Sequence, residues 1–537
     1  MTWNFGDMLD ALEAEIPGER PALVHGEQVQ SWRELSESSN RLARALIARG
    51  AKPGDKVAFY LRNRPEYLVT LCAAFKARLV HVNVNYRYLE DELHYIFENS
   101  DAKFAVFGAE FQEQVGGLVG RLRGVSHWLQ VEGAPADYAE SFAACTAEGE
   151  AGPLDVSRSP DDLVFVYTGG TTGLPKGVMW RHEDLWGATG GGATIPAHAG
   201  VAPADLEAHL VGLRKRGAGP IQIPACPLMH GTALMSSILN LMSGGTSVTL
   251  PAASFDAEEF FDTVERRHVQ AAVIVGNAFA RPLVEALDAH PGRWQLDSLR
   301  VLISSGVMWS LESKRELLHH LPQLRLADLF GSSEALGFGS SVTTLKEGVE
   351  TARFSIGDRC RVFSEDHQEV QPGSGERGFI ARSGWIPLGY YKDPEKTART
   401  FPTIGGVRYS VPGDWCRVEA DGSLTLLGRG SVCINTAGEK VYPEEVEEVL
   451  KAHAAVRDAL VVGLPDPKWG QAVTALVEAR EGAKVDEEEL RGHVRSRLAG
   501  YKTPKRFFPV ERMFRGANGK PDYKAALDFA VRERGED

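Results

Sequence analysis

A loop rich in glycine and threonine that ends in a lysine is the segment of this chain best suited to chemistry. Residues 167–178 read YTGGTTGLPKGV and directly follow the apolar residues 163–166. Glycines let backbone N–H groups approach an anion closely, threonine hydroxyls donate hydrogen bonds, and Lys176 supplies a positive charge. In the Walker loop of P-loop nucleotidases the lysine precedes Ser or Thr, whereas Lys176 precedes Gly177. The composition therefore predicts a polyphosphate site of a different kind.

Further short segments that combine glycine with hydroxyl, carboxylate, imidazole or ammonium groups follow along the chain. They are 227–231 (PLMHG), 305–307 (SGV), 328–334 (DLFGSSE), 409–414 (YSVPGD), 428–429 (GR), 438–445 (GEKVYPEE) and 519–520 (GK). Such groups can hold phosphate and ribose through hydrogen bonds and can offer hard oxygen ligands to Mg²⁺.

This series, in this order, resembles the adenylate-forming superfamily of acyl-CoA synthetases, luciferases and the adenylation domains of peptide synthetases. The resemblance spans essentially the whole chain and implies two reactions. A carboxylate first attacks the α-phosphate of ATP, which gives an acyl-adenylate and pyrophosphate, and a thiol then displaces AMP. The resemblance thus implies ATP and coenzyme A as substrates and Mg²⁺ as cofactor.

The resemblance also implies roles for individual residues. Lys520 corresponds to the catalytic lysine of adenylation and Glu334 to the magnesium ligand, with Thr168 and Lys176 as further catalytic groups. Phe330 is expected to stack on adenine, and Asp328 to contact the adenine edge. The expected ATP-binding residues are Thr168, Gly169, Gly170, Thr171, Thr172, Gly173, Lys176, Ser305, Gly306, Val307, Asp328, Leu329, Phe330, Gly331, Ser332, Ser333, Asp414, Arg429 and Lys520.

The second reaction is implied to use a different face of the small domain. Gly438 matches the glycine past which the phosphopantetheine arm reaches the site, with Glu439 and Lys440 beside it as coenzyme A contacts. At the hinge the family usually carries Lys or Asp two residues after the arginine, and this chain has Ser431 there. Serine tolerates varied backbone angles, so the hinge can still work, with a different electrostatic bias.

These assignments have structural alternatives. Glu334 could be a helix N-cap, Asp414 and Gly438 turn residues, and Lys520 a surface lysine. His182 is expected to cap or pack rather than to act chemically. A non-catalytic binding protein on the same fold is disfavoured, because the charged residues of the motifs are all present: Lys176, Glu334, Asp414, Arg429 and Lys520.

Longer sequence segments indicate which class of carboxylic acid the enzyme would activate. Residues 167–185, 389–398, 427–435 and 438–450 resemble acyl-CoA synthetases of steroid side-chain and long or branched fatty-acid degradation. This subset implies a large, apolar acid, with substrate contacts from His230, Gly231, Asn277, Phe279, Gly306 and Leu336; such residues could equally fill an ordinary core. Transfer to a carrier protein, or closure of a β-lactone without coenzyme A, remain alternatives.

Composition limits the class of protein. A chain of 537 residues is too long for one core. The net charge of −13 argues against a nucleic-acid surface, and no apolar run reaches the length of a spanning helix. Six scattered cysteines without a CxxC pair indicate buried, reduced thiols and a cytoplasmic protein. The expected partners are therefore the acid, ATP and coenzyme A, and a homodimer stays open.

The spacing of apolar residues predicts the elements that position these motifs. A helix over 32–49, a strand over 57–60, a helix over 65–76 and a strand over 79–82 form a strand–helix–strand unit. The same rhythm recurs around 271–275 and 301–303.

From Gly378 on, the sequence pattern predicts short strands and turns. Asp421-Gly422 predicts a hairpin between 415–418 and 424–427, and residues 428–431 look like a linker. A compact unit follows, with a helix opened by Pro443, a strand over 459–462 and a helix over 486–498.

We therefore predict an α/β fold. A large domain (1–429) contains layered αβα sheets and a β-subdomain, and a small mobile α+β domain (430–537) follows.

Overall fold

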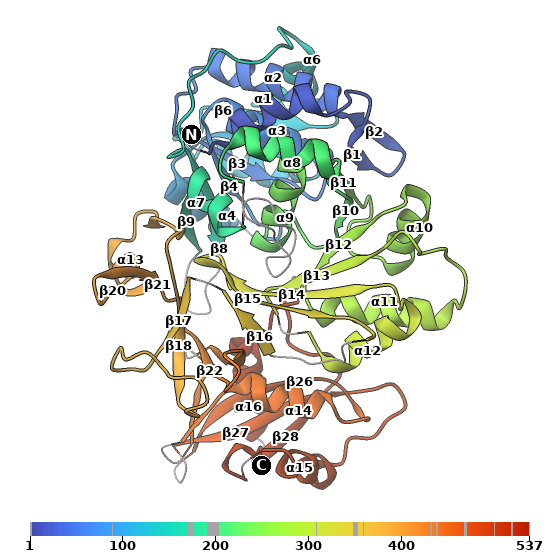
Figure 1. The fold of residues 1–537 in the computed structure, drawn as a ribbon, viewed down its shortest axis with the longest axis vertical. Coiled ribbons are helices and arrows are strands. Elements are labelled where there is room, and N and C mark those ends of the chain that lie inside the picture. Colours follow the sequence, from blue (N-terminus) through green and yellow to red (C-terminus); the bar gives the residue numbers. More distant parts are fainter. Residues whose placement is uncertain are drawn as a thin grey trace.

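The structure is a computed structural model of the chain. It describes residues 3–88, 90–168, 175–190, 203–307, 309–346, 353–357, 359–429, 432–436, 439–466, 470–498, 500–516 and 519–535, with the backbone alone at 429, 435, 439, 440 and 470. Two large sheets with covering helices occupy most of the molecule, and a smaller α+β unit lies beneath them (Figure 1).

The N-terminal half forms an eight-stranded sheet in the order β19-β9-β8-β4-β3-β5-β6-β7. Strands β8, β4, β3, β5, β6 and β7 are parallel, and β9 and β19 add an antiparallel edge. The bounds are β3 (Lys56–Tyr60), β4 (Val80–Asn83), β5 (Ala102–Gly108), β6 (His127–Val131), β7 (Glu140–Ser141), β8 (Leu163–Thr168), β9 (Lys176–Arg181) and β19 (Gly389–Tyr390).

A second sheet of fifteen strands is parallel from β1 to β14 along its path, with β2 antiparallel at the edge, and is antiparallel after β14. Its path is β2-β1-β11-β10-β12-β13-β14-β15-β16-β23-β22-β18-β21-β20, with β17 on β18. The bounds are β1 (Pro21–His25), β2 (Gln28–Ser31), β10 (Ile221–Pro224), β11 (Thr246–Thr249), β12 (Ala271–Ile274), β13 (Val301–Ser305), β14 (Arg325–Ser332), β15 (Ala335–Thr343), β16 (Arg353–Ile356), β17 (Cys360–Phe363), β18 (Arg377–Ser383), β20 (Thr403–Ile404), β21 (Val407–Ser410), β22 (Asp414–Val418) and β23 (Leu424–Arg429). The expected β-subdomain is therefore continuous with the parallel sheet through the β15–β16 pair.

Helices cover these sheets and begin where the sequence carries good caps. Ser31 and Glu34 form a capping box at the start of α2, and Gly50 beyond its end has φ +84°. The bounds are α1 (Phe5–Glu15), α2 (Trp32–Ala48), α3 (Pro65–Lys76), α4 (Glu90–Ser100), α5 (Gln112–Val119), α6 (Phe142–Ala147), α7 (His182–Ala188), α8 (Leu206–Arg216), α9 (Gly231–Met242), α10 (Ala257–Arg267), α11 (Asn277–Ala289), α12 (Leu311–His320) and α13 (Pro394–Thr400). Among the described helices none is long and apolar enough to cross a membrane.

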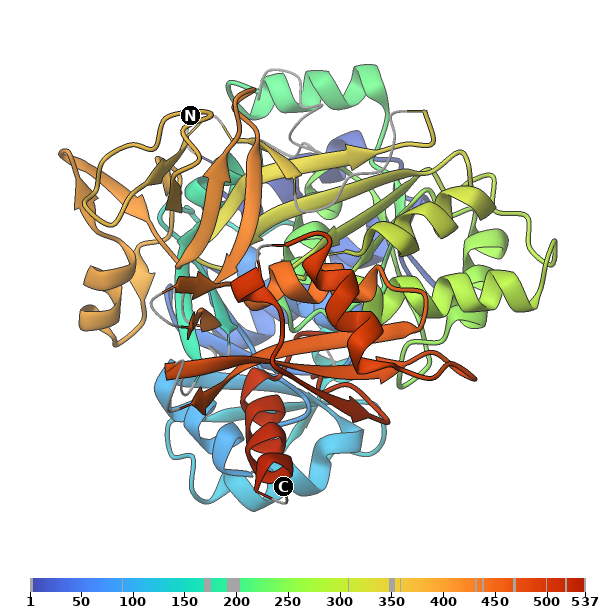
Figure 2. The ribbon, with the colours of Figure 1, turned by 90° about the horizontal axis from the view of Figure 1, so that it is seen from below.

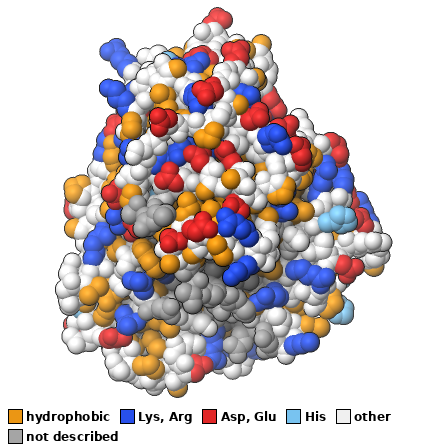
Figure 3. All heavy atoms as spheres, turned by 45° about the horizontal axis from the view of Figure 1, so that its top comes forward, with side chains coloured by type: hydrophobic (Ala, Val, Ile, Leu, Met, Phe, Trp, Pro, Cys, Tyr) orange, Lys and Arg blue, Asp and Glu red, His pale blue; other side chains and the backbone are white. Residues whose placement is uncertain are grey.

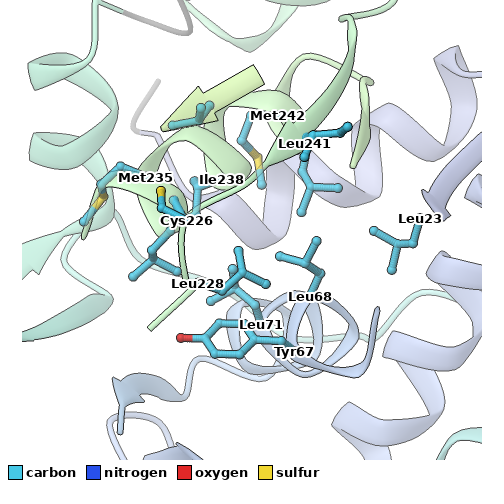
Figure 4. Close-up of a cluster of buried hydrophobic side chains, with 14 of the residues drawn as sticks. Leu23, Tyr67, Leu68, Leu71, Cys226, Leu228, Met235, Ile238, Leu241 and Met242 are labelled. Carbon is cyan, nitrogen blue, oxygen red and sulfur yellow. The ribbon is translucent and has the colours of Figure 1, made fainter. Parts of the chain in front are cut away.

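Helix α9 lies in the core between the two sheets. Its side chains Ile238, Leu241 and Met242 lie close to Leu68 and Leu71 of α3, as Figure 4 shows. All of these side chains are at most 1% exposed. One face of α9 therefore packs in the hydrophobic core, and another face of the helix points elsewhere.

The small unit is a five-stranded sheet between helices (Figure 2). Alternate residues of β26 point to two cores: Ala459 and Val461 face α14 and α15, and Leu460 and Val462 face α16. The order is β25-β24-β27-β26 with β28 on β27. The bounds are β24 (Ile434–Thr436), β25 (Glu439–Val441), β26 (Val456–Asp466), β27 (Gly470–Ala479), β28 (Arg506–Val510), α14 (Pro443–Lys451), α15 (Glu487–Arg495) and α16 (Tyr523–Arg534).

The α/β class and the large-plus-small arrangement are as predicted, and the linker needs correction. The β22–β23 hairpin and the helix over 65–76 are confirmed. Gly428 and Arg429 are not in a linker, because they pair with β22 as the end of β23. The predicted helix over 486–498 is shorter, with Asp486 as its N-cap. We keep the domain boundary between residues 429 and 430 as a proposal.

Candidate active site

One cavity of about 450 Å³ collects many of the residues that the motifs predicted. It lies at the carboxyl ends of the parallel strands β12, β13 and β14, the position at which open α/β sheets bind ligands. The predicted residues that line it are Thr168, His230, Gly231, Ser305, Gly306, Leu329, Phe330, Gly331, Ser332, Ser333, Glu334, Leu336 and Lys520.

Glu334 is held in the turn between β14 and β15. The Tyr390 hydroxyl donates to Glu334 Oε1 at 2.7 Å, and Ser410 Oγ donates to the Glu334 carbonyl at 2.7 Å. Trp180 Nε1 donates to the carbonyl of Ser333 at 2.9 Å. A strand follows at Ala335, so Glu334 is not a helix N-cap. The structure presents this carboxylate to the cavity in a fixed position.

Lys520 reaches the same cavity from the small unit. The Gly516 amide donates to the Lys520 carbonyl at 2.8 Å, and the Gly519 amide donates to the Gly516 carbonyl at 2.9 Å. Gly519 has φ +74°, and a Cβ there would lie 2.6 Å from Ala278 Cβ. The glycine lets this turn approach α11 closely and so places Lys520 at the cavity.

A partly buried ion pair supports the turn that carries Lys520. Arg515 donates to Asp458 through Nε at 2.6 Å and Nη2 at 2.9 Å, and its Nη1 donates to the Gly519 carbonyl at 3.1 Å. The Asp458 carboxylate raises the pKa of Arg515 against the effect of burial. Sequence reasoning missed this pair, since its partners are separated by 57 residues.

His230 is a neutral group at the start of α9. Burial, with smaller effects from the charges of Lys520 and Arg87, lowers its pKa to about 3. Its Nε2 is buried and has no hydrogen-bond partner among the described residues. A neutral imidazole beside an ammonium can donate or accept a hydrogen bond without adding charge.

Asn83 is a polar residue of the cavity wall that sequence reasoning also missed. Asn83 Nδ2 donates to the carbonyls of Tyr167 and Met229 at 2.8 and 2.7 Å, and its Oδ1 accepts from the Tyr167 amide at 2.7 Å. It thereby ties the end of β4 to β8 and to the turn that carries His230. Lys396 also lines the cavity, and its ammonium lies 4.3 Å from the Tyr390 ring centroid. Lys396 lies within the string 389–398, but no motif assigned a role to it or to Asn83.

Several predicted residues lie beside the cavity rather than on its wall. Lys176 pairs with Asp393 at 3.0 Å. Asp328 is 7% exposed and pairs with Lys314, and burial raises its pKa. Val307 and Asp414 also lie off the described wall, while only the backbone is described for Arg429, Glu439 and Lys440; Asp414 and Arg429 are direct partners across β22 and β23.

Phe330 lines the cavity, yet its ring packs in the core. It lies against Phe338 and Phe354 at centroid distances of 5.3 and 5.2 Å. Its exposed fraction is 7%. The ring of Phe330 therefore packs mainly against these two aromatic neighbours, and its stacking on adenine stays a prediction.

Asn277 and Phe279 are not among the described residues that line the cavity, and their contact with the substrate stays a prediction. Asn277 Oδ1 accepts hydrogen bonds from Ser310, and the Phe279 ring lies 4.9 Å from that of Phe255. The chain turns into α11 after Gly276, whose φ is +53°, and these side chains face neighbouring elements instead. His182 packs as expected, between Phe5 and Phe75. The predicted Gly169–Gly173 and Gly438 lie outside the described residues.

Comparison with known proteins agrees with this arrangement. Residues 12–391 match the model of the AMP-binding enzyme family, and residues 445–520 match the AMP-binding enzyme C-terminal domain. The chain is 41% identical over 540 residues to a medium/long-chain-fatty-acid–CoA/3-oxocholest-4-en-26-oate–CoA ligase of Mycobacterium marinum, with 98% of this chain and 96% of that protein covered. It is 39% identical to a 3-oxocholest-4-en-26-oate–CoA ligase of Rhodococcus rhodochrous, with 98% and 96% covered.

The fold of this chain is also similar to the folds of solved structures. The anthranilate CoA ligase AuaEII in complex with anthranoyl-AMP matches with a TM-score of 0.84 at 20% identity, over 99% of this chain and 98% of that chain. ATP-bound MatB from Rhodopseudomonas palustris matches with a TM-score of 0.81 at 23% identity, over 98% and 99%. By its family matches and its near full-length relatives, this chain belongs to the AMP-binding enzyme family.

Proposed function

We propose that this chain is an AMP-forming acyl-CoA synthetase that activates a large, apolar carboxylic acid. One observation carries the proposal: a single cavity joins Glu334 and Lys520 at the strand ends to a row of side chains along α9. The relatives at 41% and 39% identity bear the names of CoA ligases for fatty acids and a steroid acid, which supports the same activity here.

In the first reaction, a carboxylate oxygen of the acid bonds to the α-phosphorus of ATP, and the bond to the β-phosphate oxygen breaks. Lys520 is proposed to stabilise the charge that develops on the α-phosphate and on the attacking carboxylate. The polar wall formed by Thr168, Ser305 and Ser333 is proposed to contact ATP phosphates. Neutral His230 beside Lys520 would add no charge against the incoming carboxylate.

The residues present fit a magnesium ion at Glu334. In the described part of the chain, no cluster of three or more His, Cys, Asp or Glu could hold a metal by itself. One fixed carboxylate facing a cavity instead suits an ion that takes its remaining ligands from phosphate oxygens and water. When bound, Mg²⁺ would neutralise phosphate charge. Tyr390 orients the carboxylate that would hold it.

Other assigned roles remain proposals. Asp414 and Arg429 are proposed to contact ribose, and their pairing across β22 and β23 puts them at one place in the sheet. Lys176 is proposed to bind the departing pyrophosphate, for which it would exchange its partner Asp393.

The second reaction is proposed to use coenzyme A. Its thiolate sulfur bonds to the carbonyl carbon of the acyl-adenylate, and AMP leaves with the carboxyl oxygen. Gly438, Glu439 and Lys440 are the proposed contacts. A cytoplasmic location and a homodimer stay predictions. On the face in Figure 3, acidic and basic side chains are intermixed, in line with a small-molecule enzyme rather than a nucleic-acid surface.

Pyrophosphate release, measured with and without coenzyme A across a panel of acids, tests the proposal. We expect slow release without coenzyme A and multiple turnovers with it, with acyl-CoA formed in equal amount. Turnover that needs a carrier protein, or turnover without any thiol, would instead support the alternative ligases. Absence of pyrophosphate release with every acid would contradict adenylation itself.

A further inference from the structure

Two lysines lie close together at one end of the eight-stranded sheet, near the start of β9. Lys176 is the first residue of β9 and pairs in register with Thr168 of β8. Its ammonium lies 3.0 Å from one carboxylate oxygen of Asp393, and the other oxygen accepts a hydrogen bond from the backbone amide of Lys396 at 2.9 Å. Asp393 therefore holds the segment that carries Lys396 close to the Thr168 part of the cavity.

The two ammonium groups differ in what they contact. The ammonium of Lys176 is paired with Asp393, whereas that of Lys396 lies over the Tyr390 ring, 4.3 Å from its centroid. Within the described part of the chain, the Lys396 ammonium forms no ion pair or hydrogen bond. A contact with a ring face uses none of the three N–H donors of an ammonium. Because Lys396 also lines the cavity, these donors are available to an anion that enters it.

The Tyr390 side chain links Lys396 to Glu334. Its ring face contacts the ammonium, and its hydroxyl donates to Glu334 Oε1 at 2.7 Å. A magnesium ion held by Glu334 would take phosphate oxygens as further ligands. The ammonium on the same tyrosine is therefore positioned to contact the same phosphates, which lysines bind as point charges.

Lys396 and Lys520 approach the cavity from different sheets. A Cβ on Gly306, directly after β13 of the fifteen-stranded sheet, would lie 4.0 Å from Lys520 Cε. Lys396 instead follows β19, the edge strand of the eight-stranded sheet. With Lys520 acting at the α-phosphate, as proposed, the side of Lys396 and Thr168 is left for the β- and γ-phosphates.

We propose that Lys396 binds the two terminal phosphates of ATP and the pyrophosphate released from them. The inference rests on the proposed function and adds a residue to its leaving-group end. When the carboxylate oxygen bonds to the α-phosphorus, the bond from this phosphorus to the bridging oxygen breaks, and that oxygen leaves with the electron pair as part of pyrophosphate. The ammonium of Lys396 stabilises the negative charge that develops there. Lys176 must leave Asp393 to do the same, whereas Lys396 gives up only a ring contact.

Binding without turnover tests this role. Dissociation constants of ATP, inorganic pyrophosphate and AMP for the full chain are measured by calorimetry, with excess Mg²⁺ and without acid or coenzyme A. Lys396→Met keeps a long apolar side chain beside Tyr390 but removes the charge. It should weaken the binding of ATP and pyrophosphate roughly 10- to 100-fold and leave that of AMP, which lacks these phosphates, unchanged. The loss should persist at high Mg²⁺.

Two further variants complete the test. Lys396→Arg keeps a positive charge and should restore most of the affinity for ATP and pyrophosphate. Lys392→Ala is the matched control, because this lysine belongs to the same segment, its ammonium pairs with Asp101 at 2.7 Å, and it is not among the described residues that line the cavity. It should keep the wild-type affinity for all three ligands.

Equal weakening of all three ligands in Lys396→Met, or recovery of ATP binding at high Mg²⁺, would overturn the inference, because either result would show that Lys396 supports the site only indirectly. Unchanged binding of ATP and pyrophosphate would overturn it as well, and so would a wild-type protein that binds ATP no more tightly than AMP. None of these results decides the proposed synthetase activity, which fails only if no acid yields acyl-CoA.

Discussion

At the residue scale, Lys520 carries the charge on which the proposed adenylation depends. It lines the cavity from a turn held by two backbone hydrogen bonds and by Arg515. Lys520→Ala should lower the rate of adenylate formation roughly a hundred- to thousand-fold, because it removes one preorganised charge. Thioester formation from a supplied acyl-adenylate should stay largely intact, as measured by acyl-CoA production in the two separate half-reactions.

The control for this prediction is Lys524→Ala, an exposed lysine on α16 of the same unit. It should leave both half-reactions near wild type. Equal losses in the two half-reactions of Lys520→Ala would contradict a role limited to adenylation.

Tyr390 is predicted to act through Glu334. Its hydroxyl donates to Glu334 Oε1 at 2.7 Å. Tyr390→Phe removes this bond but keeps the ring, so the carboxylate is less well oriented. We expect the Mg²⁺ concentration for half-maximal adenylation to rise roughly 10- to 100-fold, with recovery at high Mg²⁺.

The neighbouring Tyr391 offers a matched control, because its hydroxyl donates to Asp101 at 2.6 Å instead. Tyr391→Phe should keep the wild-type Mg²⁺ dependence. A fall in rate for Tyr390→Phe that high Mg²⁺ does not correct would show that the tyrosine supports the fold of the turn and not the metal site.

At the element scale, sequence patterns predicted most of the secondary structure that could be read from local signals. Pro65, Asp421-Gly422 and Pro443 marked α3, the β22–β23 hairpin and α14 correctly. These signals are local because they depend on backbone angles and capping within a few residues. The prediction of a linker over 428–431 was wrong at its first two residues for a non-local reason. Gly428 and Arg429 pair with β22 and therefore extend β23.

More of the predicted residues line the cavity near Glu334 and Lys520 than near α11. Residues of β13, β14 and the turn before α9 reach the wall because strand ends converge there. The orientation of α11 could not be predicted, because it depends on the turn at Gly276 and on packing against Phe255. The row of side chains along α9 did carry a signal, the spacing of residues 232–243, but apolar spacing alone does not distinguish a cavity face from a core face.

Blocking α9 tests whether its row of side chains binds the acyl chain. Ser236 lies midway along this row, and its Oγ donates to the Ala233 carbonyl at 3.0 Å. Ser236→Phe should fill the cavity at this depth, so long acids should lose at least tenfold in kcat/KM while octanoate loses little. The gain per buried methylene, about 0.8 kcal/mol, should disappear beyond the block in a chain-length series.

Ser236→Ala, which leaves the cavity open, is the control and should keep the wild-type series. Equal losses for short and long acids in Ser236→Phe would indicate a disturbed fold rather than a shortened cavity. An optimum at acetate in the wild type would contradict a large apolar substrate altogether.

At the scale of the whole molecule, the site exists only because distant parts of the chain meet. Lys520 comes within reach of the β13 end, where a Cβ on Gly306 would lie 4.0 Å from Lys520 Cε. Ion pairs between Arg480 and Glu312, and between Arg457 and Glu285 at 3.5 Å, join the small unit to α11 and α12. Sequence motifs gave the members of this assembly, while the contacts that hold it depend on surfaces that no local pattern specifies.

Stability of the whole molecule is predicted to fall in acid because of buried histidines. His182 is 1% exposed, and burial lowers its pKa to about 3. Its Nδ1 accepts the Phe5 amide proton at 3.2 Å, which requires the neutral ring. In the unfolded chain the pKa of histidine is about 6.5, so between pH 6.5 and 3 the unfolded state binds more protons. The contribution of His182 is therefore complete above pH 6.5 and decreases as pH falls, by about 2 kcal/mol at pH 5.

His182→Gln should separate this titration from the packing role of the ring. Glutamine can still accept from the Phe5 amide but does not titrate, so the variant should be less stable at pH 7 and lose less stability between pH 7 and 5. Urea unfolding at several pH values measures both, and the difference in acid loss should be about 2 kcal/mol. His319→Gln, at an exposed position of α12, is the control and should keep the wild-type pH dependence. If His182→Gln and the wild type lose the same stability on acidification, His182 is not among the groups whose protonation drives acid unfolding.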